Sequence, residues 1–164
     1  MLFVILSVQF NINNLYFIET NKSNENESQV NKIFIRFIYS TPFFSMNNIC
    51  IQILFKAYKI EKYYNKCKCI FSILENEDCI QFIQSLEQNI LTQYHNSFQT
   101  QEKTPLYKLS EQIQTGEIKL YHNNLPIYNT SNSQYNIILK ISGIWNTDDM
   151  YGITYKYLYM KNII

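Results

Sequence analysis

The sequence predicts a mainly β domain with one long and one short helix inserted between strands. Two observations lead to this fold class. Short runs of apolar, β-branched and aromatic residues recur along the 164 residues, and Asn, Ser and Asp separate them more often than the 3 Gly and 3 Pro do; such runs are typical of strands. In one central segment the apolar spacing changes to that of a helix. The length fits a single domain over 1–164, and the 46% hydrophobic share is enough for a core.

Most of the chain is expected to form strands. The segment 21–31 is polar and lacks periodicity, so we expect a flexible loop there. The strands are expected on both sides of a helical region, over 2–12 and 15–20 around an Asn13-Asn14 turn, then over 32–39, 49–59, 60–73, 117–121, 135–145 and 151–159. The last two flank an Asn-Thr-Asp-Asp turn and are expected to form a hairpin.

The helical region begins near Asn76, which can cap a helix. Up to Phe98 the apolar residues fall at helical spacing, namely at Ile80, Ile83, Leu86, Ile90, Leu91 and Tyr94. A shorter helix is expected after Pro105 and before Gly116, with Leu106, Leu109 and Ile113 turned inward. Strands, a central helix and more strands follow one another in an elaborated OB-type barrel, although other α+β sheets have the same order.

Composition narrows the function classes. The net charge is +1, so a nucleic-acid site would need local segregation of charge. The four cysteines are expected to be reduced packing groups, because Cys67-Lys-Cys69 lacks the two-residue spacer of zinc knuckles. Neither a Gly-rich phosphate loop nor a nucleophile motif is present, and the two His stand outside any motif. We therefore expect no catalysis, no cofactor and no metal.

The first ten residues lack the features of a targeting segment. They have no basic region, their apolar run is short, and no small-residue cleavage site follows. A run of this length is also too short to span a bilayer. We therefore expect a first strand, an intracellular protein and no membrane association.

The range 55–71 is the most informative. Its five lysines stand against a single acid, Glu61; they are Lys56, Lys59, Lys62, Lys66 and Lys68. Alternate residues of a strand share a face, which groups Lys62, Tyr64, Lys66 and Lys68 opposite Cys67, Cys69 and Phe71. Lysines neutralise phosphates, and a tyrosine ring stacks on a base of any sequence. The alternative is a solvated face whose lysines protect a sheet edge, and on this range alone it is the simpler interpretation.

Other strands add candidates. Phe34 and Arg36 share one face of 32–39, and Trp145 ends a strand, where its ring can either cap the core or stack on a base. Lys156 lies opposite a stripe of alternating tyrosines that is more typical of a core than of a ligand platform. The acids at Glu75, Glu77, Asp78 and Glu87 follow the basic range and predict a molecule with two faces of opposite sign. The candidate DNA-binding residues are Phe34, Arg36, Lys59, Lys62, Tyr64, Lys66, Lys68, Trp145 and Lys156.

Three segments resemble a known family. They are Phe34-Ile-Arg-Phe-Ile-Tyr-Ser-Thr-Pro-Phe-Phe-Ser-Met-Asn47, Tyr58-Lys-Ile-Glu-Lys-Tyr-Tyr-Asn-Lys66 and Ile141-Ser-Gly-Ile-Trp-Asn-Thr-Asp-Asp-Met-Tyr-Gly-Ile-Thr-Tyr-Lys156. They resemble the OB-fold single-stranded-DNA-binding proteins of nucleocytoplasmic large DNA viruses, which are similar in fold to phage replication-type single-stranded-DNA-binding proteins. The resemblance runs from about residue 30 onward, and its C-terminal block is the most distinctive.

The resemblance implies an OB barrel and a sequence-independent grip on single-stranded DNA in viral replication, recombination or repair. It places the protein in a cytoplasmic viral factory or the nucleus, with replication proteins as expected partners; RNA binding and a homo-oligomer are compatible with it. Phage members of the wider group end in an acidic tail, whereas this chain ends Tyr-Met-Lys-Asn-Ile-Ile164, so recruitment through such a tail is not expected. The alternative is a non-enzymatic structural or protein-interaction domain of a large DNA virus.

Overall fold

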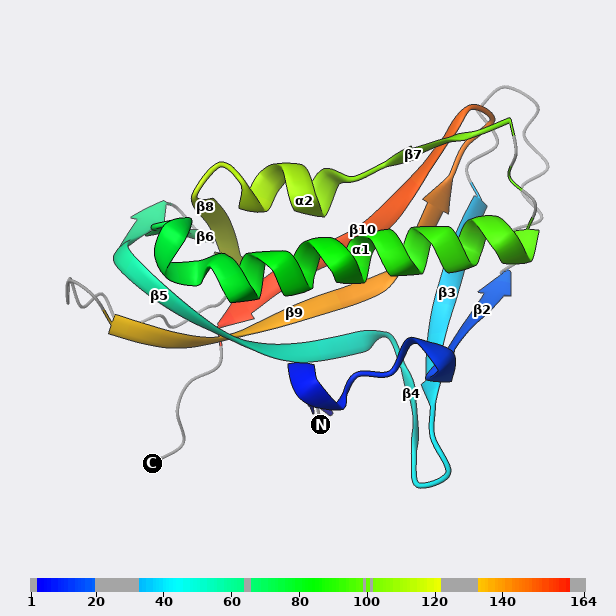
Figure 1. Cartoon of the computed structure of the whole chain (residues 1–164), viewed down its shortest axis with the longest axis horizontal. Helices are drawn as coiled ribbons and strands as arrows, with labels where there is room; N and C mark the ends of the chain where they lie inside the picture. Colours follow the sequence, from blue (N-terminus) through cyan, green and yellow to red (C-terminus); the bar gives the residue numbers. More distant parts are fainter. Residues whose placement is uncertain are drawn as a thin grey trace.

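The computed structural model describes residues 3–19, 33–63, 66–98, 100, 102–121 and 133–159. Within them one mixed sheet carries two α-helices, as Figure 1 shows. The helices are α1 (Glu77–Phe98) and α2 (Lys108–Ile113), and short 3-10 turns cover Ser7–Gln9, Ile12–Asn14 and Leu74–Asn76. The strands are β1 (Ile5–Leu6), β2 (Leu15–Glu19), β3 (Ile33–Ser40), β4 (Ser45–Asn47), β5 (Ile49–Tyr63), β6 (Lys66–Phe71), β7 (Thr104–Leu106), β8 (Glu117–Tyr121), β9 (Ser133–Asn146) and β10 (Met150–Tyr159).

Five of the strands close into a barrel. Going round it, β5 pairs with β6, β6 with β8, β8 with β10, β10 with β9, and β9 again with β5. All these pairings are antiparallel except that between β8 and β10. Both helices lie between β6 and β8 in the chain. The predicted fold class, a mainly β, OB-fold-like barrel with a long and a short helix inserted between strands, is confirmed.

The sheet continues beyond the barrel through β9. The first part of β9 pairs with β5, where Ile141 faces Ile49, and the last part pairs with β3, where Ile144 faces Ile35. β2 and β4 then pair with β3. The pairing of β9 with β10 shifts register between Thr154 and Tyr155, and this irregularity marks where β9 changes its second partner.

β5 is one long strand, not the two expected over 49–59 and 60–73. A β-bulge between Ala57 and Lys59 shifts its pairing with β6, so the buried positions change from Ala57 to Ile60. A bulge therefore lies next to the place where a strand end was expected. The chain reverses later, between Tyr63 and Lys66.

The N-terminal segment is less regular than expected. Of the strand expected over 2–12, the structure describes residues 3–12, and among these only Ile5 and Leu6 form a strand. The Asn11 side chain accepts a hydrogen bond from the Asn13 amide, and Gln9 accepts one from the Leu6 amide. Such local side-chain bonds compete with strand pairing. The strand expected over 15–20 is confirmed over Leu15–Glu19, and the loop expected over 21–31 lies outside the described residues.

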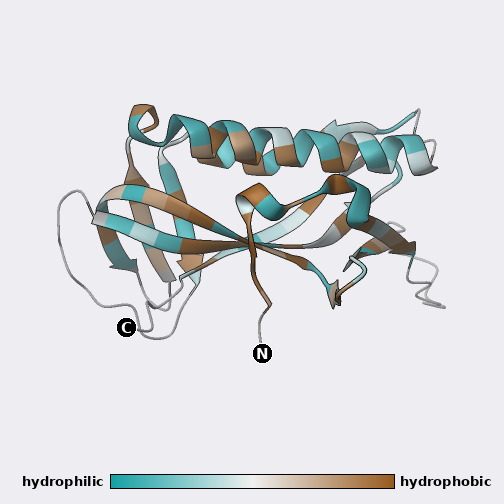
Figure 2. Ribbon diagram, turned by 60° about the horizontal axis from the view of Figure 1, so that its bottom comes forward, coloured by the Kyte–Doolittle hydropathy of each residue, from teal (hydrophilic) through white to brown (hydrophobic). Residues whose placement is uncertain are grey.

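The helix expected from Asn76 to Phe98 is confirmed as α1. All six predicted inward residues are buried, and Figure 2 shows the helix lying along one side of the sheet. Asn76 does not cap the helix as expected. Its carboxamide instead accepts a hydrogen bond from the Lys56 amide at 2.8 Å and donates one to the Lys56 carbonyl at 2.9 Å. The Asn76 side chain thus hydrogen-bonds the backbone of β5 next to the bulge, and this holds the start of the helix against β5.

Buried Glu87 joins the two helices. Its carboxylate accepts hydrogen bonds from the amides of Leu109 and Ser110, at 3.0 and 2.7 Å, and from the Ser110 hydroxyl at 2.6 Å. These donors belong to the first turn of α2, whose amides have no partner within the helix. The prediction that Glu87 adds to an acidic face is therefore wrong. The short helix itself is confirmed, with Leu109 and Ile113 buried and Gly116 just beyond its end at φ 73°. Leu106, which was expected to turn inward from this helix, instead ends the strand β7, which was not predicted, and is half-buried.

Replacing Glu87 by Gln should lower the free energy of unfolding by about 1–3 kcal/mol, because a carboxamide offers one acceptor oxygen where three donors meet. Denaturant titration measures this change. Glu75→Gln is the control, since Glu75 is exposed. Equal stability of the two variants would contradict the capping role.

The pH profile of stability gives a second test. Burial raises the pKa of Glu87, and the hydrogen bonds from Ser110 and Leu109 only partly oppose this effect. A carboxyl group whose pKa is raised by folding holds its proton more tightly in the folded chain. The parent protein should therefore lose stability as the pH rises from the ordinary glutamate range through the folded pKa. Glu87→Gln should lack this loss.

Candidate nucleic-acid interface

The outer face of the sheet consists of the positions that alternate with buried residues. On β10 the predicted tyrosine stripe points inward: Tyr151 and Tyr157 are buried, and the Tyr155 hydroxyl donates to Gln112 of α2 at 2.8 Å. Thr154 and Lys156 therefore belong to the outer face, and both are exposed. The stripe is part of the core, as its pattern indicated.

Four lysines lie side by side on this outer face, across four adjacent strands. Lys68 of β6 faces Lys119 of β8, and Lys140 of β9 faces Lys156 of β10. Lys119 and Lys156 are also neighbours, because the residues that follow them, Leu120 and Tyr157, face each other. Adjacent strands are about 4.8 Å apart. We call Lys68, Lys119, Lys156 and Lys140 the lysine row.

Little negative charge offsets the lysine row. Lys68 forms an ion pair with Glu117 at 2.6 Å, whereas none of the other three pairs with a carboxylate in the described part of the chain. Like charges directly opposite each other on a sheet are destabilising. The field of two of them reaches buried Cys50: burial raises the pKa of its thiol, and Lys140 and Lys156 act against that rise. A bound polyanion would relieve this repulsion.

Two aromatic rings lie on the same outer face. Phe34 of β3 faces Trp145 of β9, which in turn faces Gly152 of β10. Each ring covers a glycine: a Cβ on Gly143 would lie 2.8 Å from the Phe34 ring, and one on Gly152 would lie 2.8 Å from the indole of Trp145. Both rings are half-buried. Trp145 lies five positions after Lys140 on β9, which corresponds to about 16 Å along a strand.

Of the predicted residues, four therefore come together on the outer face of β3, β9 and β10; they are Phe34, Arg36, Trp145 and Lys156. Arg36 faces Gly143 and is exposed. Trp145 does not cap the core, because its ring covers Gly152 on the outer face.

The prediction that one strand face carries the lysines of 62–68 is wrong. Because the chain reverses between Tyr63 and Lys66, Lys62 faces Cys67 and so lies opposite to Lys68. Lys59 and Lys68 do lie on the outer face, but each is held by an acid, Glu61 and Glu117 respectively, at 2.6 Å. Tyr64 and the side chain of Lys66 lie outside the described part of the structure.

Sequence reasoning missed Lys119 and Lys140. Each stands between two buried apolar residues, Lys119 in β8 and Lys140 in β9. Alternation within each strand could have marked both as outward. Their meeting with Lys68 and Lys156 depends on register between strands, which no local pattern contains.

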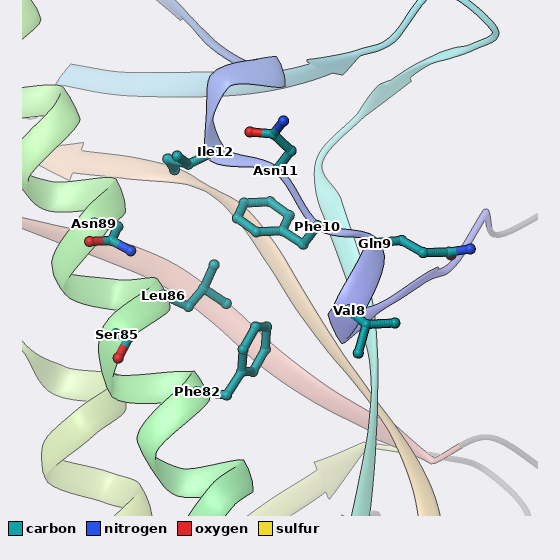
Figure 3. Close-up of a pocket in the computed structure, with 9 residues that line it drawn as sticks. All are labelled: Val8, Gln9, Phe10, Asn11, Ile12, Phe82, Ser85, Leu86 and Asn89. Carbon is teal, nitrogen blue, oxygen red and sulfur yellow. The ribbon is translucent and has the colours of Figure 1, made fainter.

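Cavities also open in the described part of the structure. One, of about 560 Å³, lies between the N-terminal segment and α1, and Figure 3 shows Phe10 facing Phe82 and Leu86 there. Its rim carries amides and a hydroxyl, including Asn11 and Asn89, and its lining has no charged side chain. It therefore offers no cationic side chain that could neutralise a phosphate. The second cavity, of about 350 Å³, is lined in part by Lys68 and Lys119 of the lysine row.

The described residues contain no cluster of three or more His, Cys, Asp or Glu side chains that could hold a metal ion. Cys50, Cys67 and Cys69 are buried free thiols, and Cys79 is a half-buried one. Neither helix in the described ranges combines the length and apolar character needed to cross a bilayer. No protein-family model, curated protein or solved structure matches this chain.

Replacing Gly143 by Ala should destabilise the protein by about 1–3 kcal/mol, the usual cost of overpacking. The new Cβ would overlap the carbonyl oxygen of Ile35 and press on the Phe34 ring, which forces β3 away from β9. Thermal unfolding measures the loss of stability. Ser142→Ala, one residue away, should change the melting temperature little; if the two variants melt alike, the approach of β3 to β9 at Gly143 leaves room for a side chain.

Proposed function

We propose that this chain is a sequence-independent single-stranded-DNA-binding protein without catalytic activity, and that its outer face is the binding surface. The observation that carries the proposal is the lysine row, in which three of four lysines on adjacent strands have no acidic partner in the described ranges. The resemblance noted in the sequence adds a role in viral DNA replication, recombination or repair.

The chemistry of the outer face suits a single strand. The lysine row would neutralise successive phosphates and release their counterions, which requires no particular base. Trp145 and Phe34 would stack on bases, and only an unpaired base offers its face to a ring. Arg36 faces Gly143, between the aromatic pair and the lysine row, where a guanidinium can contact either a phosphate or a base.

The position of the lysine row in the barrel also supports the proposal. OB barrels bind oligonucleotides on the face of their second and third strands. In the pairing order of this barrel these strands are β6 and β8, which carry Lys68 and Lys119. The row then continues onto β10 and β9, so the proposed surface extends this face round the barrel.

The competing function is a structural or protein-interaction domain of a large DNA virus. The uncharged cavity between the N-terminal segment and α1 favours it, together with the high exposure of Val8 at its edge. Salt dependence separates the two functions, because phosphate binding weakens steeply as salt rises and contact through an apolar surface does not.

Replacing Lys119 and Lys156 together by Gln should weaken binding to all single-stranded oligonucleotides alike. It should also flatten the dependence of log K on log salt by about 0.7 for each phosphate that is no longer neutralised. Fluorescence anisotropy at several salt concentrations measures both effects. The matched control is Lys62→Gln with Lys108→Gln, two exposed lysines outside the row. If both double variants bind as the parent does, the lysine row is only a solvated surface.

Trp145 allows an independent test, because it is the only tryptophan. Oligo-dT should quench its fluorescence as it binds. Trp145→Leu should keep an apolar cover over Gly152 but reduce affinity by roughly 1–3 kcal/mol through weaker stacking, with little change in the salt slope. Unchanged Trp145 emission on saturation with oligo-dT would exclude the ring from the contact surface.

A further inference from the structure

The smaller cavity opens beside the lysine row. It is lined by Cys67 and Lys68 of β6, by Gln112 and Thr115 at the end of α2, and by Glu117 and Lys119 of β8, among others. The strand pairing gives it room, since β8 pairs with β10 only at the end of β8, through Leu120 and Tyr121. Its volume of about 350 Å³ lies at the lower end of the range for small-ligand pockets, roughly 300–1,000 Å³, which suits one base better than several.

The cavity offers one acceptor and one donor beyond its two lysines. Glu117 pairs with Lys68 through a single oxygen, and a carboxylate has about four lone-pair positions, so it can accept further hydrogen bonds. The side-chain oxygen of Gln112 accepts from the Tyr155 hydroxyl at 2.8 Å. That bond orients the carboxamide, and its NH₂ group donates to no other described residue.

This pairing of groups selects among bases. Cytosine and adenine each present an exocyclic amino donor beside a ring-nitrogen acceptor on their Watson–Crick edge, whereas thymine presents the reverse. Unstacked single-stranded bases are read on that edge, and a carboxylate is a suitable acceptor for the cytosine amine. Glu117 as acceptor and Gln112 as donor match the edge of cytosine and adenine and oppose that of thymine.

We infer that this cavity holds one unpaired base with an exocyclic amino group, which donates to Glu117 while Lys68 and Lys119 contact the neighbouring phosphates. The inference rests on the proposed function and refines it: the phosphate grip is independent of sequence, but one nucleotide position is not. It also gives Glu117 a role that a carboxylate in a polyanion-binding surface otherwise lacks.

The test compares oligo-dC and oligo-dT of equal length by fluorescence anisotropy at low salt. The parent should bind oligo-dC about tenfold more tightly, the effect of one well-placed base contact. Glu117→Met removes the acceptor and should make the two affinities equal.

The chain provides a matched control in Glu61→Met. Glu61 also pairs with a lysine, Lys59, at 2.6 Å on the outer face, but it does not line the cavity. Both variants lose one negative charge, so any general gain in affinity for DNA should appear in both. Only Glu117→Met should lose the preference for oligo-dC.

Circular dichroism checks that each variant folds, and Gln112→Met tests the opposite wall of the cavity if Glu117→Met does not fold. Equal binding of both oligonucleotides by the parent overturns the base pocket and leaves the proposed function standing. If Glu117→Met, or Gln112→Met in its place, still prefers oligo-dC to oligo-dT, the base pocket is likewise overturned and the proposed function stands. If the parent binds neither oligonucleotide at low salt, the proposed function itself fails.

Discussion

β9 is hydrogen-bonded to other strands along both of its edges, and the rest of the architecture depends on which strands these are. One edge follows β10 along most of its length, and the other is shared between β5, which closes the barrel, and β3, which extends the sheet. The change of partner requires the close approach of β3 at Gly143, where a side chain would meet the Ile35 carbonyl. The same pairing turns the tyrosines of β10 inward, which leaves Lys140 and Lys156 facing each other on the outside.

Two buried polar side chains attach the helices to this frame. Asn76 bonds both backbone groups of Lys56 and holds the start of α1 beside the β5 bulge. Glu87, from the middle of α1, satisfies the first amides of α2. Since buried polar groups are costly unless they are paired, these contacts specify where each helix lies. They keep α1 over the core and leave the outer positions of β9 and β10 to polar and aromatic side chains.

The proposed function follows from an imbalance of charge. The chain as a whole is almost neutral, and two lysines near the β5–β6 hairpin are matched by acids. On β8, β10 and β9 the described lysines of the row have no such partner, and aromatic rings lie farther along the same face. Local excess of positive charge beside stacking surfaces is the combination that a sequence-tolerant single-strand binder uses. Glu117, within this region, is the natural place for the one contact that depends on base identity.

The sequence by itself determined what depends on neighbours along the chain. Helical spacing of apolar residues predicted α1, and the Asn-Thr-Asp-Asp segment predicted the turn between β9 and β10. Alternation along each strand predicted that Phe34 and Arg36 share a face and that Lys156 lies opposite the tyrosines of β10, and the structure agrees. Only the tertiary structure decided the rest. The β5 bulge and the chain reversal before Lys66 place Lys62 on the face opposite to Lys68. Glu87 is buried because its carboxylate accepts the hydrogen bonds of the first amides of α2. The lysine row exists because four separate strands pair in one register, and register is set by long-range packing that no single segment encodes.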